Sequence, residues 1–146
     1  MTALTSSSSY DPKVKTFFNW LGVTHFLTRD EVFTTLRSIT AIAPAGIIIV
    51  FDYLDIDAFI PKKSSQQMQK SLEYLRKIGE PMITGFNPST LGEELASLGF
   101  SLQENLSPAD IEERYFKGRT DGYHAYSMGL CMCSCQIIRH IICFSG

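Results

Sequence analysis

Two side chains that could handle a proton stand just after apolar runs in the first half of the chain. His25 follows the run at residues 17–23, and Asp52 lies at the end of the run at residues 47–53. Histidine is the usual general base near neutral pH, and only His25 and Asp52 are plausible candidates to deprotonate a hydroxyl group. Both are therefore candidates for contact with a substrate. An exposed loop histidine and a helix-capping aspartate would explain the same residues without chemistry.

The run at residues 47–53 reads IIIVFDY and shows no polar alternation. A continuous β-branched run of this kind is typical of a strand covered on both faces in a parallel sheet. In open α/β sheets, ligands bind beyond the carboxyl ends of the strands. Tyr53 is therefore a further candidate for substrate contact, with an aromatic side chain at the rim of the fold as the alternative.

Capping signals and periodicity predict the elements that would position these residues. Thr28 and Glu31 have the spacing of a capping box, and apolar residues follow at helical spacing until residues 44–46 turn the chain. Further helices are expected over about residues 62–78, from residue 87 to 98 and from residue 107 to 115, with a strand over residues 100–106. The order of strands and helices predicts an α/β fold.

The cysteines all lie near the end of the chain, at Cys131, Cys133, Cys135 and Cys143. On a strand the first three would share one face, and thiolates are soft metal ligands. Structural zinc sites use C-x₂₋₄-C spacing, which this run lacks. We therefore expect buried, reduced thiols and no metal, with a thiol or metal-binding module as a weaker alternative. The run QIIRHIICF at residues 136–144 could form a last strand.

The composition is that of one ordinary globular domain. The 146 residues carry 13 basic and 15 acidic side chains, a net charge of −2, without a basic run, so nucleic acid is not an expected partner. Residues 1–9 are rich in serine, and we expect a disordered lead-in rather than a signal peptide. Polar residues interrupt the longest apolar stretch, residues 128–144, so no membrane anchor is expected and a cytoplasmic location is the default.

Four segments occur together in an order and spacing that resemble one known family. They are NWLGVTHFLT, TLRSI, IIIVFDYLD and GEPMITGFNPSTLGEELASLGFSLQENLSPADIEERYFKGRTDG. Over residues 10–123 the chain resembles the C-terminal half of the leucine carboxyl methyltransferase family, in its largely bacterial branch of S-adenosylmethionine-dependent methyltransferases. The resemblance ends before residues 124–146, which form a divergent cysteine-rich tail.

The resemblance implies the fold: α/β, the C-terminal half of a class I Rossmann-like methyltransferase sheet with flanking helices. Residues 17–23, 47–53 and 100–106 would be the family's fourth, fifth and sixth strands. No G-x-G motif occurs in the sequence, so the glycine-rich turn that approaches the cofactor in such folds has no counterpart. We therefore expect a fragment without the cofactor-binding half, whose first strand is an open sheet edge.

The resemblance also implies binding residues. Trp20, Leu21, Gly22 and Val23 match the family's segment beside S-adenosylmethionine, although core side chains and a tight glycine turn explain them equally well. Arg119 closes a segment of the form R-Y-F-x-G-R, in which an arginine would suit a carboxylate on the substrate or on the cofactor. A helix C-terminus whose dipole the arginine complements, with Gly118 as its left-handed stop, is the alternative. No residue is assigned a catalytic role.

Two functions follow from the resemblance. The intact relative would transfer a methyl group from S-adenosylmethionine to a carboxylate or hydroxyl oxygen of a small molecule, with the protein supplying mainly alignment. A carboxylate acceptor needs no base, whereas a hydroxyl group does. The alternative is a non-catalytic remnant or docking protein that pairs with a methyltransferase, or with a second copy of itself, through the open strand edge.

Overall fold

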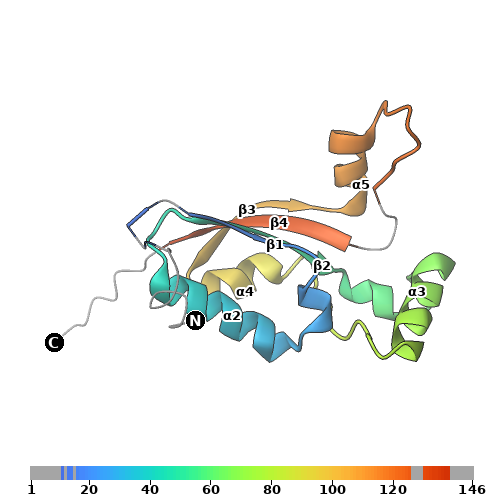
Figure 1. The fold of residues 1–146 in the computed structure, drawn as a ribbon, viewed down its shortest axis with the longest axis horizontal. Helices are drawn as coiled ribbons and strands as arrows, with labels where there is room; N and C mark the ends of the chain where they lie inside the picture. Colours follow the sequence, from blue (N-terminus) through green and yellow to red (C-terminus); the bar gives the residue numbers. More distant parts are fainter. Residues whose placement is uncertain (1–10, 12, 15, 126–129, 139–146) are drawn as a thin grey trace.

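The computed structural model describes residues 11, 13–14, 16–125 and 130–138, which form a mixed sheet of four strands with helices around it. The strand order is β1-β2-β4-β3 (Figure 1). β1 (Phe17–Trp20) pairs in parallel with β2 (Ile48–Leu54). β4 (Leu130–Ile137) lies between β2 and β3 (Phe100–Leu106) and is antiparallel to both. The predicted α/β fold is confirmed.

The last strand lies earlier in the chain than the run QIIRHIICF. Of that run, only Gln136 and Ile137 belong to β4, and residues 139–144 lie outside the described part of the chain. The alternating cysteines precede them in β4. The backbone of these cysteines is hydrogen-bonded to β2 on one side and to β3 on the other, so the sheet is continuous from β1 to β3.

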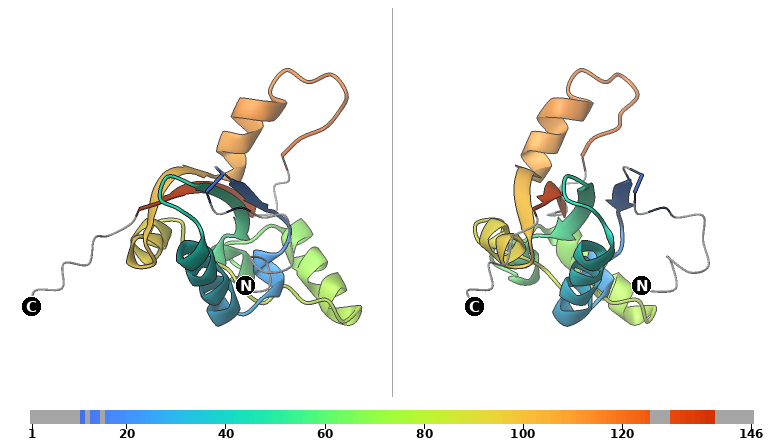
Figure 2. Two further views of the ribbon diagram at one scale, coloured as in Figure 1. Left: turned by 60° about the vertical axis from the view of Figure 1, so that its left-hand side comes forward. Right: turned by 90° about the vertical axis from the view of Figure 1, so that its left-hand side faces the viewer.

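Helices α2 (Arg29–Ile42) and α4 (Leu91–Ser97) cover one face of the sheet (Figures 1 and 2). α2 begins at the predicted capping box: the Thr28 hydroxyl accepts from the Glu31 N–H at 3.2 Å, and Glu31 accepts from the Thr28 N–H at 2.7 Å. Their apolar sides pack on alternate residues of the strands. The core contains Val32, Leu36, Ile39, Ile49, Phe51, Tyr53, Leu91, Leu95 and Phe100.

The opposite face of the sheet carries no helix of the described chain except at one end, where the segment after β3 projects (Figure 2). Burial alternates along β2 up to Tyr53: Ile48 is 39% exposed and Val50 is half-buried, whereas Ile49 is fully buried. Only at its end does the second face become covered, where Leu54 is buried against Ala58 and Met68. The expectation that this strand is covered on both faces is wrong for the described residues. Its β-branched run supplies apolar side chains to both faces, but α2 and α4 lie on one side only.

Two helices begin later than predicted: one is expected from about residue 62 and one from the cap at Asn87. α3 (Gln66–Lys77) starts after Ser65, whose hydroxyl accepts from the Met68 N–H at 3.1 Å. Asn87 does not cap α4, because its side chain accepts from the Ser89 N–H at 2.9 Å and closes a turn instead. α4 then begins at Leu91, without a side-chain cap.

The segment after β3 projects from the sheet, and we call residues 108–125 the arm (Figure 2). It consists of α5 (Pro108–Ile111), a π-helix η3 (Glu112–Phe116) and a loop. A second capping box starts it, formed by Ser107 and Asp110. The helix expected from residue 107 to 115 is confirmed, with a π-helical second half, a geometry that is frequent at functional sites.

The cysteines of β4 face the core, as their alternation predicts. Cys131, Cys133 and Cys135 are each at most 2% exposed, and burial raises the pKa of Cys133 well above the usual range and that of Cys135 to about 12. Cys143 lies outside the described residues. Within the described ranges, no group of three metal-ligating side chains could hold an ion. No helix there is long and apolar enough to span a bilayer.

Replacing Tyr53 by phenylalanine tests the polar contact inside the sheet. The Tyr53 hydroxyl donates to Asn105 Oδ1 at 2.6 Å, and Tyr53 is fully buried. Tyr53→Phe should lower the free energy of unfolding in urea by about 1–2 kcal/mol, because the Asn105 oxygen loses its partner. Tyr74→Phe, at an exposed helical position, is the control and should change it by less than about 0.5 kcal/mol. Equal effects would show that this hydrogen bond does not stabilise the sheet.

Alkylation tests the burial of the three thiols. In a Cys143→Ser background at about pH 8, close to the pKa of about 8.5 of an exposed thiol, Cys131, Cys133 and Cys135 should react with iodoacetamide at least tenfold more slowly in the native protein than in urea. Mass spectrometry of the quenched protein reports the rates. Native reaction as fast as that of the unfolded chain would contradict the core-facing placement.

Candidate functional site

The carboxyl ends of β1 and β2 meet where Gly22 contacts Asp52. The two strands are parallel neighbours with Trp20 opposite Phe51, so the residues that follow them lie at one edge of the sheet. The Gly22 N–H donates to Asp52 Oδ1 at 2.8 Å. Gly22 has φ +74°, and a Cβ there would meet nothing within 4 Å, so backbone conformation rather than space requires glycine.

The turn after Gly22 also makes hydrogen bonds to β2 and to the segment before α4. It forms the 3₁₀-helix η1 (Thr24–Phe26), and the buried Thr24 hydroxyl donates to the Asp52 carbonyl at 2.7 Å. The His25 carbonyl accepts from the Ile83 N–H at 2.8 Å. The segment that leads out of β1 is therefore fixed against β2 and against the chain that precedes α4.

His25 is buried rather than exposed in a loop, with 4% of its surface accessible. Its ring lies 4.5 Å from that of Phe26, centroid to centroid, and its Nδ1 has no hydrogen-bond partner among the described residues. Burial lowers the pKa of His25, and the nearby charge of Asp52 offsets part of that effect. Burial thus favours the neutral imidazole, and Asp52 lies close enough to act on it electrostatically.

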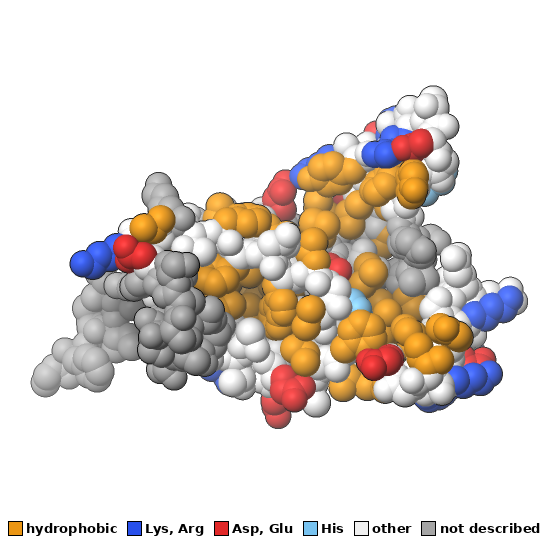
Figure 3. Space-filling model, in the orientation of Figure 1, with side chains coloured by type: hydrophobic (Ala, Val, Ile, Leu, Met, Phe, Trp, Pro, Cys, Tyr) orange, Lys and Arg blue, Asp and Glu red, His pale blue; other side chains and the backbone are white. Residues whose placement is uncertain are grey.

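Asp52 lies at the wall of a hollow of about 250 Å³ between the sheet and the arm. The space-filling view shows apolar side chains on the side of the arm that faces the sheet (Figure 3). The hollow is lined by Asp52, Pro108, Ile111, Phe116, His124, Ala125, Leu130, Cys131 and Met132. It is a mostly apolar space with one carboxylate at its wall, at the end of the strands where ligands bind in open α/β sheets.

His124 is a residue of this hollow that the sequence did not point to. Its Nδ1 lies 2.8 Å from Glu112 Oε1, and the Ala125 N–H donates to Glu112 Oε2 at 2.5 Å. The hydrogen bond with His124 lowers the pKa of Glu112. These contacts tie the end of the arm back to η3. His124 falls in the tail, where no spacing or motif could have marked it.

The four residues matched to the cofactor segment lie around the end of β1. Trp20 is half-buried, with its ring 6.3 Å from that of Phe51, and packs on the core. Leu21 is 45% exposed, so the alternative that it is a core residue is wrong. Gly22 is exposed and Val23 is half-buried. Leu21 and Gly22 therefore offer an accessible surface beside Asp52.

Tyr53 and Arg119 lie away from the hollow. Tyr53 points to the face opposite Asp52, where its hydroxyl is bound to Asn105. Arg119 is at the tip of the arm, where its Nε donates to Asp121 Oδ1 at 3.0 Å and its guanidinium lies 5.7 Å from the ring centroid of Phe116. Gly118 before it has φ +79°, which is the left-handed helix stop of the alternative interpretation.

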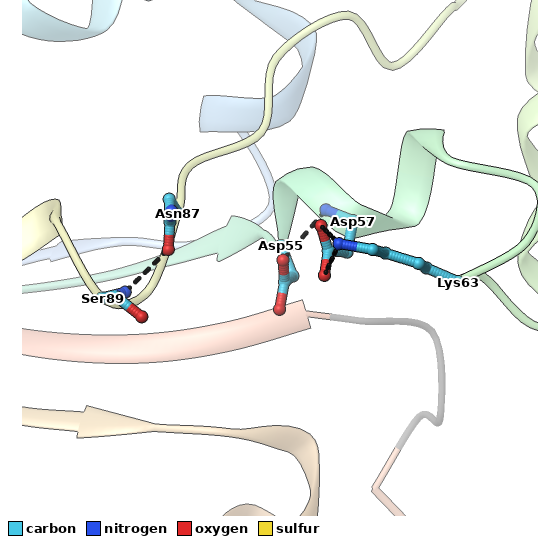
Figure 4. Close-up of polar contacts among 5 residues, drawn as sticks. All are labelled: Asp55, Asp57, Lys63, Asn87 and Ser89. Carbon is cyan, nitrogen blue, oxygen red and sulfur yellow. Dashed lines mark hydrogen bonds and ion pairs between the residues drawn. The ribbon is translucent and has the colours of Figure 1, made fainter.

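A second group of charged residues follows β2 and has a structural explanation (Figure 4). Asp55 caps the 3₁₀-helix η2 (Ile56–Phe59), because its Oδ1 accepts from the Asp57 N–H at 3.0 Å. Lys63 Nζ lies 3.2 Å from Asp57 Oδ1. Each carboxylate is thus engaged by its own segment, so this group is not a candidate site.

Comparison with known proteins gives one curated relative. No protein-family model matches the chain. A protein of Bacillus subtilis (strain 168) named "Putative S-adenosyl-L-methionine-dependent methyltransferase YktD" is 34% identical over 129 residues, which cover 84% of this chain and 42% of that protein. The chain therefore spans less than half the length of the curated relative that it matches.

Solved structures establish the fold. A DUF574 family protein from Streptomyces avermitilis superposes with a TM-score of 0.62 at 12% identity, over 93% of this chain and 50% of its own. A chain of the structure described as "Complex between the Haloferax volcanii Trm112 methyltransferase activator and the putative methyltransferase" gives 0.51 at 12% identity, over 85% of this chain and 54% of its own. The chain has a Rossmann-like α/β fold, as the sequence resemblance implied. In sequence it is similar to one protein that carries the name of an S-adenosylmethionine-dependent methyltransferase.

Proposed function

We propose that the chain acts in an S-adenosylmethionine-dependent O-methyltransferase of the leucine carboxyl methyltransferase family. The observation that carries the proposal is the contact between Gly22 and Asp52, which joins an accessible turn to a hollow at the carboxyl ends of two parallel strands. When bound, the cofactor supplies an electrophilic methyl group. The chain's own part is to bind, to orient and to accept a proton.

The end of β1 fits one side of such a cofactor. Gly22 leaves its backbone open, since no atom lies within 4 Å of where a Cβ would be, and Leu21 is exposed next to it. Trp20, Leu21, Gly22 and Val23 would hold the cofactor there. The glycine-rich turn that approaches the methionine part in Rossmann-like folds is not in this sequence. Polypeptide outside these 146 residues, or a partner chain, would contribute it.

The hollow beneath the arm would take a small-molecule methyl acceptor. Asp52 belongs both to the turn contact and to the hollow, so an acceptor beside it would lie near the proposed cofactor position. His25 is a buried imidazole whose pKa is lowered by burial and raised in part by the charge of Asp52. Alignment of the two reactants is the main catalytic contribution required of a methyltransferase.

A non-catalytic docking protein is the second candidate, favoured by the outer edge of β1. In the described sheet β1 has one strand neighbour, β2, and Phe17 on this edge strand is 61% exposed. Such an edge can be extended by a strand from another chain. The added strand could come from a methyltransferase or from a second copy of this chain.

Calorimetry with S-adenosylmethionine tests the first proposal. The purified chain should bind with a Kd below about 1 mM, equivalent to about −4 kcal/mol. Gly22→Ala should weaken binding at least tenfold, because the new Cβ enters the space beside the turn. Gly79→Ala is the matched control: Gly79 also has positive φ and open space around it, but lies at the end of α3. Absence of binding by the parent chain at millimolar cofactor would contradict cofactor binding by this chain.

Analytical ultracentrifugation tests the docking candidate in its homo-oligomeric form. Phe17→Lys places a charge on the exposed edge strand and should raise the monomer fraction at a given concentration, since edge charges oppose strand pairing. Tyr74→Lys, at an equally exposed helical position, should leave the distribution unchanged. A monomeric parent chain would remove self-pairing from consideration.

A further inference from the structure

The charges around the hollow limit the kind of acceptor that it can take. Among the described residues that line it, Asp52 and His124 have side chains that can carry a charge, and none is a lysine or an arginine. The Cys131 thiol is kept neutral, because burial raises its pKa.

His124 does not offset the charge of Asp52. It already lies against Glu112, with 2.8 Å between Nδ1 and Oε1, so the two form a pair of their own. Asp52 receives a backbone N–H from Gly22, and no cationic side chain of the described residues pairs with it. Within the described lining, the hollow therefore presents one carboxylate that no lysine or arginine neutralises.

The arginines nearest in sequence to the arm's lining residues are engaged elsewhere. Arg114 pairs with Glu104 on β3 at 2.7 Å, and Arg119 pairs with Asp121 at the tip of the arm. A bound carboxylate is usually held by a cation or by several N–H donors. Neither is offered by the described residues that line this space.

The other side chains that line the hollow are mostly apolar and come from both the arm and the sheet. Pro108, Ile111 and Phe116 belong to the arm, and Leu130 and Met132 belong to β4. Asp52 Oδ1 is engaged by Gly22, and no contact of the described residues engages Oδ2. An apolar molecule between these walls could donate a hydroxyl hydrogen to Oδ2.

We infer that the methyl acceptor is an uncharged, largely apolar molecule that presents a hydroxyl group, and not a carboxylate, to Asp52. The inference rests on the proposed function and decides between the two acceptor classes that the sequence leaves open. As the acceptor oxygen gains the methyl group, its proton passes to Asp52 Oδ2, and the sulfonium of the cofactor becomes a neutral thioether. A carboxylate acceptor would instead place two anions together in an apolar space.

A pair of probes of the same shape tests this without cofactor or turnover: 2-naphthol and 2-naphthoate. At about pH 7 the phenol, with a pKa near 10, is neutral, whereas the carboxylate, with a pKa near 4, is charged. Ligand-observed NMR titration of the purified chain should show saturable binding of 2-naphthol and at least tenfold weaker binding of 2-naphthoate. Similar affinities, or a preference for 2-naphthoate, would overturn the inference, and so would the absence of binding by both.

Three variants assign the preference to the hollow. Asp52→Asn keeps an acceptor for the Gly22 N–H and should bring the two affinities within about threefold. Ile111→Lys adds a cation on the arm, outside the sheet core, and should reverse the preference. Asp57→Asn, whose carboxylate pairs with Lys63 after β2, should leave the ratio unchanged. A ratio that neither Asp52→Asn nor Ile111→Lys moves would overturn the assignment.

The cofactor experiment and the probe experiment can fail separately, so their outcomes can be told apart. If the chain prefers 2-naphthol over 2-naphthoate but does not bind S-adenosylmethionine, the cofactor proposal is rejected for this chain. The selectivity of the hollow for a hydroxyl group is then kept. Cofactor binding without probe discrimination would keep the proposed function and reject the hydroxyl class. Competition between 2-naphthol and S-adenosylmethionine for one site would also overturn the inference, because the hollow and the end of β1 would then be the same site.

Discussion

Strand β4 is hydrogen-bonded to β2 along one side and to β3 along the other, and the whole sheet depends on this double pairing. The core-facing side chains of β4 are small where the paired side chains of β2 are large. Cys133 lies opposite Phe51, and Cys131 lies opposite Tyr53. A thiol beside an aromatic ring leaves room for the ring to pack, and Tyr53 contacts Phe86 edge-on with 6.2 Å between ring centroids. The alternating cysteines are thus explained by packing, as small buried apolar side chains.

The one-sided cover of the sheet has two consequences for function. On the covered face, side chains are committed to packing, and Tyr53 is held there by Asn105. On the other face, Asp52 is left partly accessible at the edge where β1 and β2 end, and among the described segments the arm lies above it. Because successive side chains of a strand point to opposite faces, Tyr53 is committed to the core whereas Asp52 remains available to a ligand. The exposed Phe17 and Ile48 mark the rest of this face as a surface that further polypeptide could cover.

Ion pairing restricts where charge is available. Lys63, Arg114 and Arg119 each lie against an aspartate or glutamate of a nearby segment. Exposed pairs of this kind add little stability, but they leave the described lining of the hollow without a lysine or an arginine. The acceptor class proposed above follows from this distribution as much as from the presence of Asp52.

The sequence by itself determined the local features, because each depends on residues within a few positions of one another. The capping boxes at Thr28 and Ser107, the alternation of the cysteines and the helix stop at Gly118 are all of this kind. The α/β class could also be predicted, since it follows from the order of strands and helices.

Only the tertiary structure decided which residues meet across long separations. It brought Gly22 to Asp52, placed His124 at the hollow, buried His25, turned Tyr53 into the core and moved Arg119 to the tip of the arm. It also left β2 covered on one face, although its continuous apolar run predicts cover on both. These outcomes depend on strand order and on which side the helices pack, and neither is encoded in the spacing of neighbouring residues.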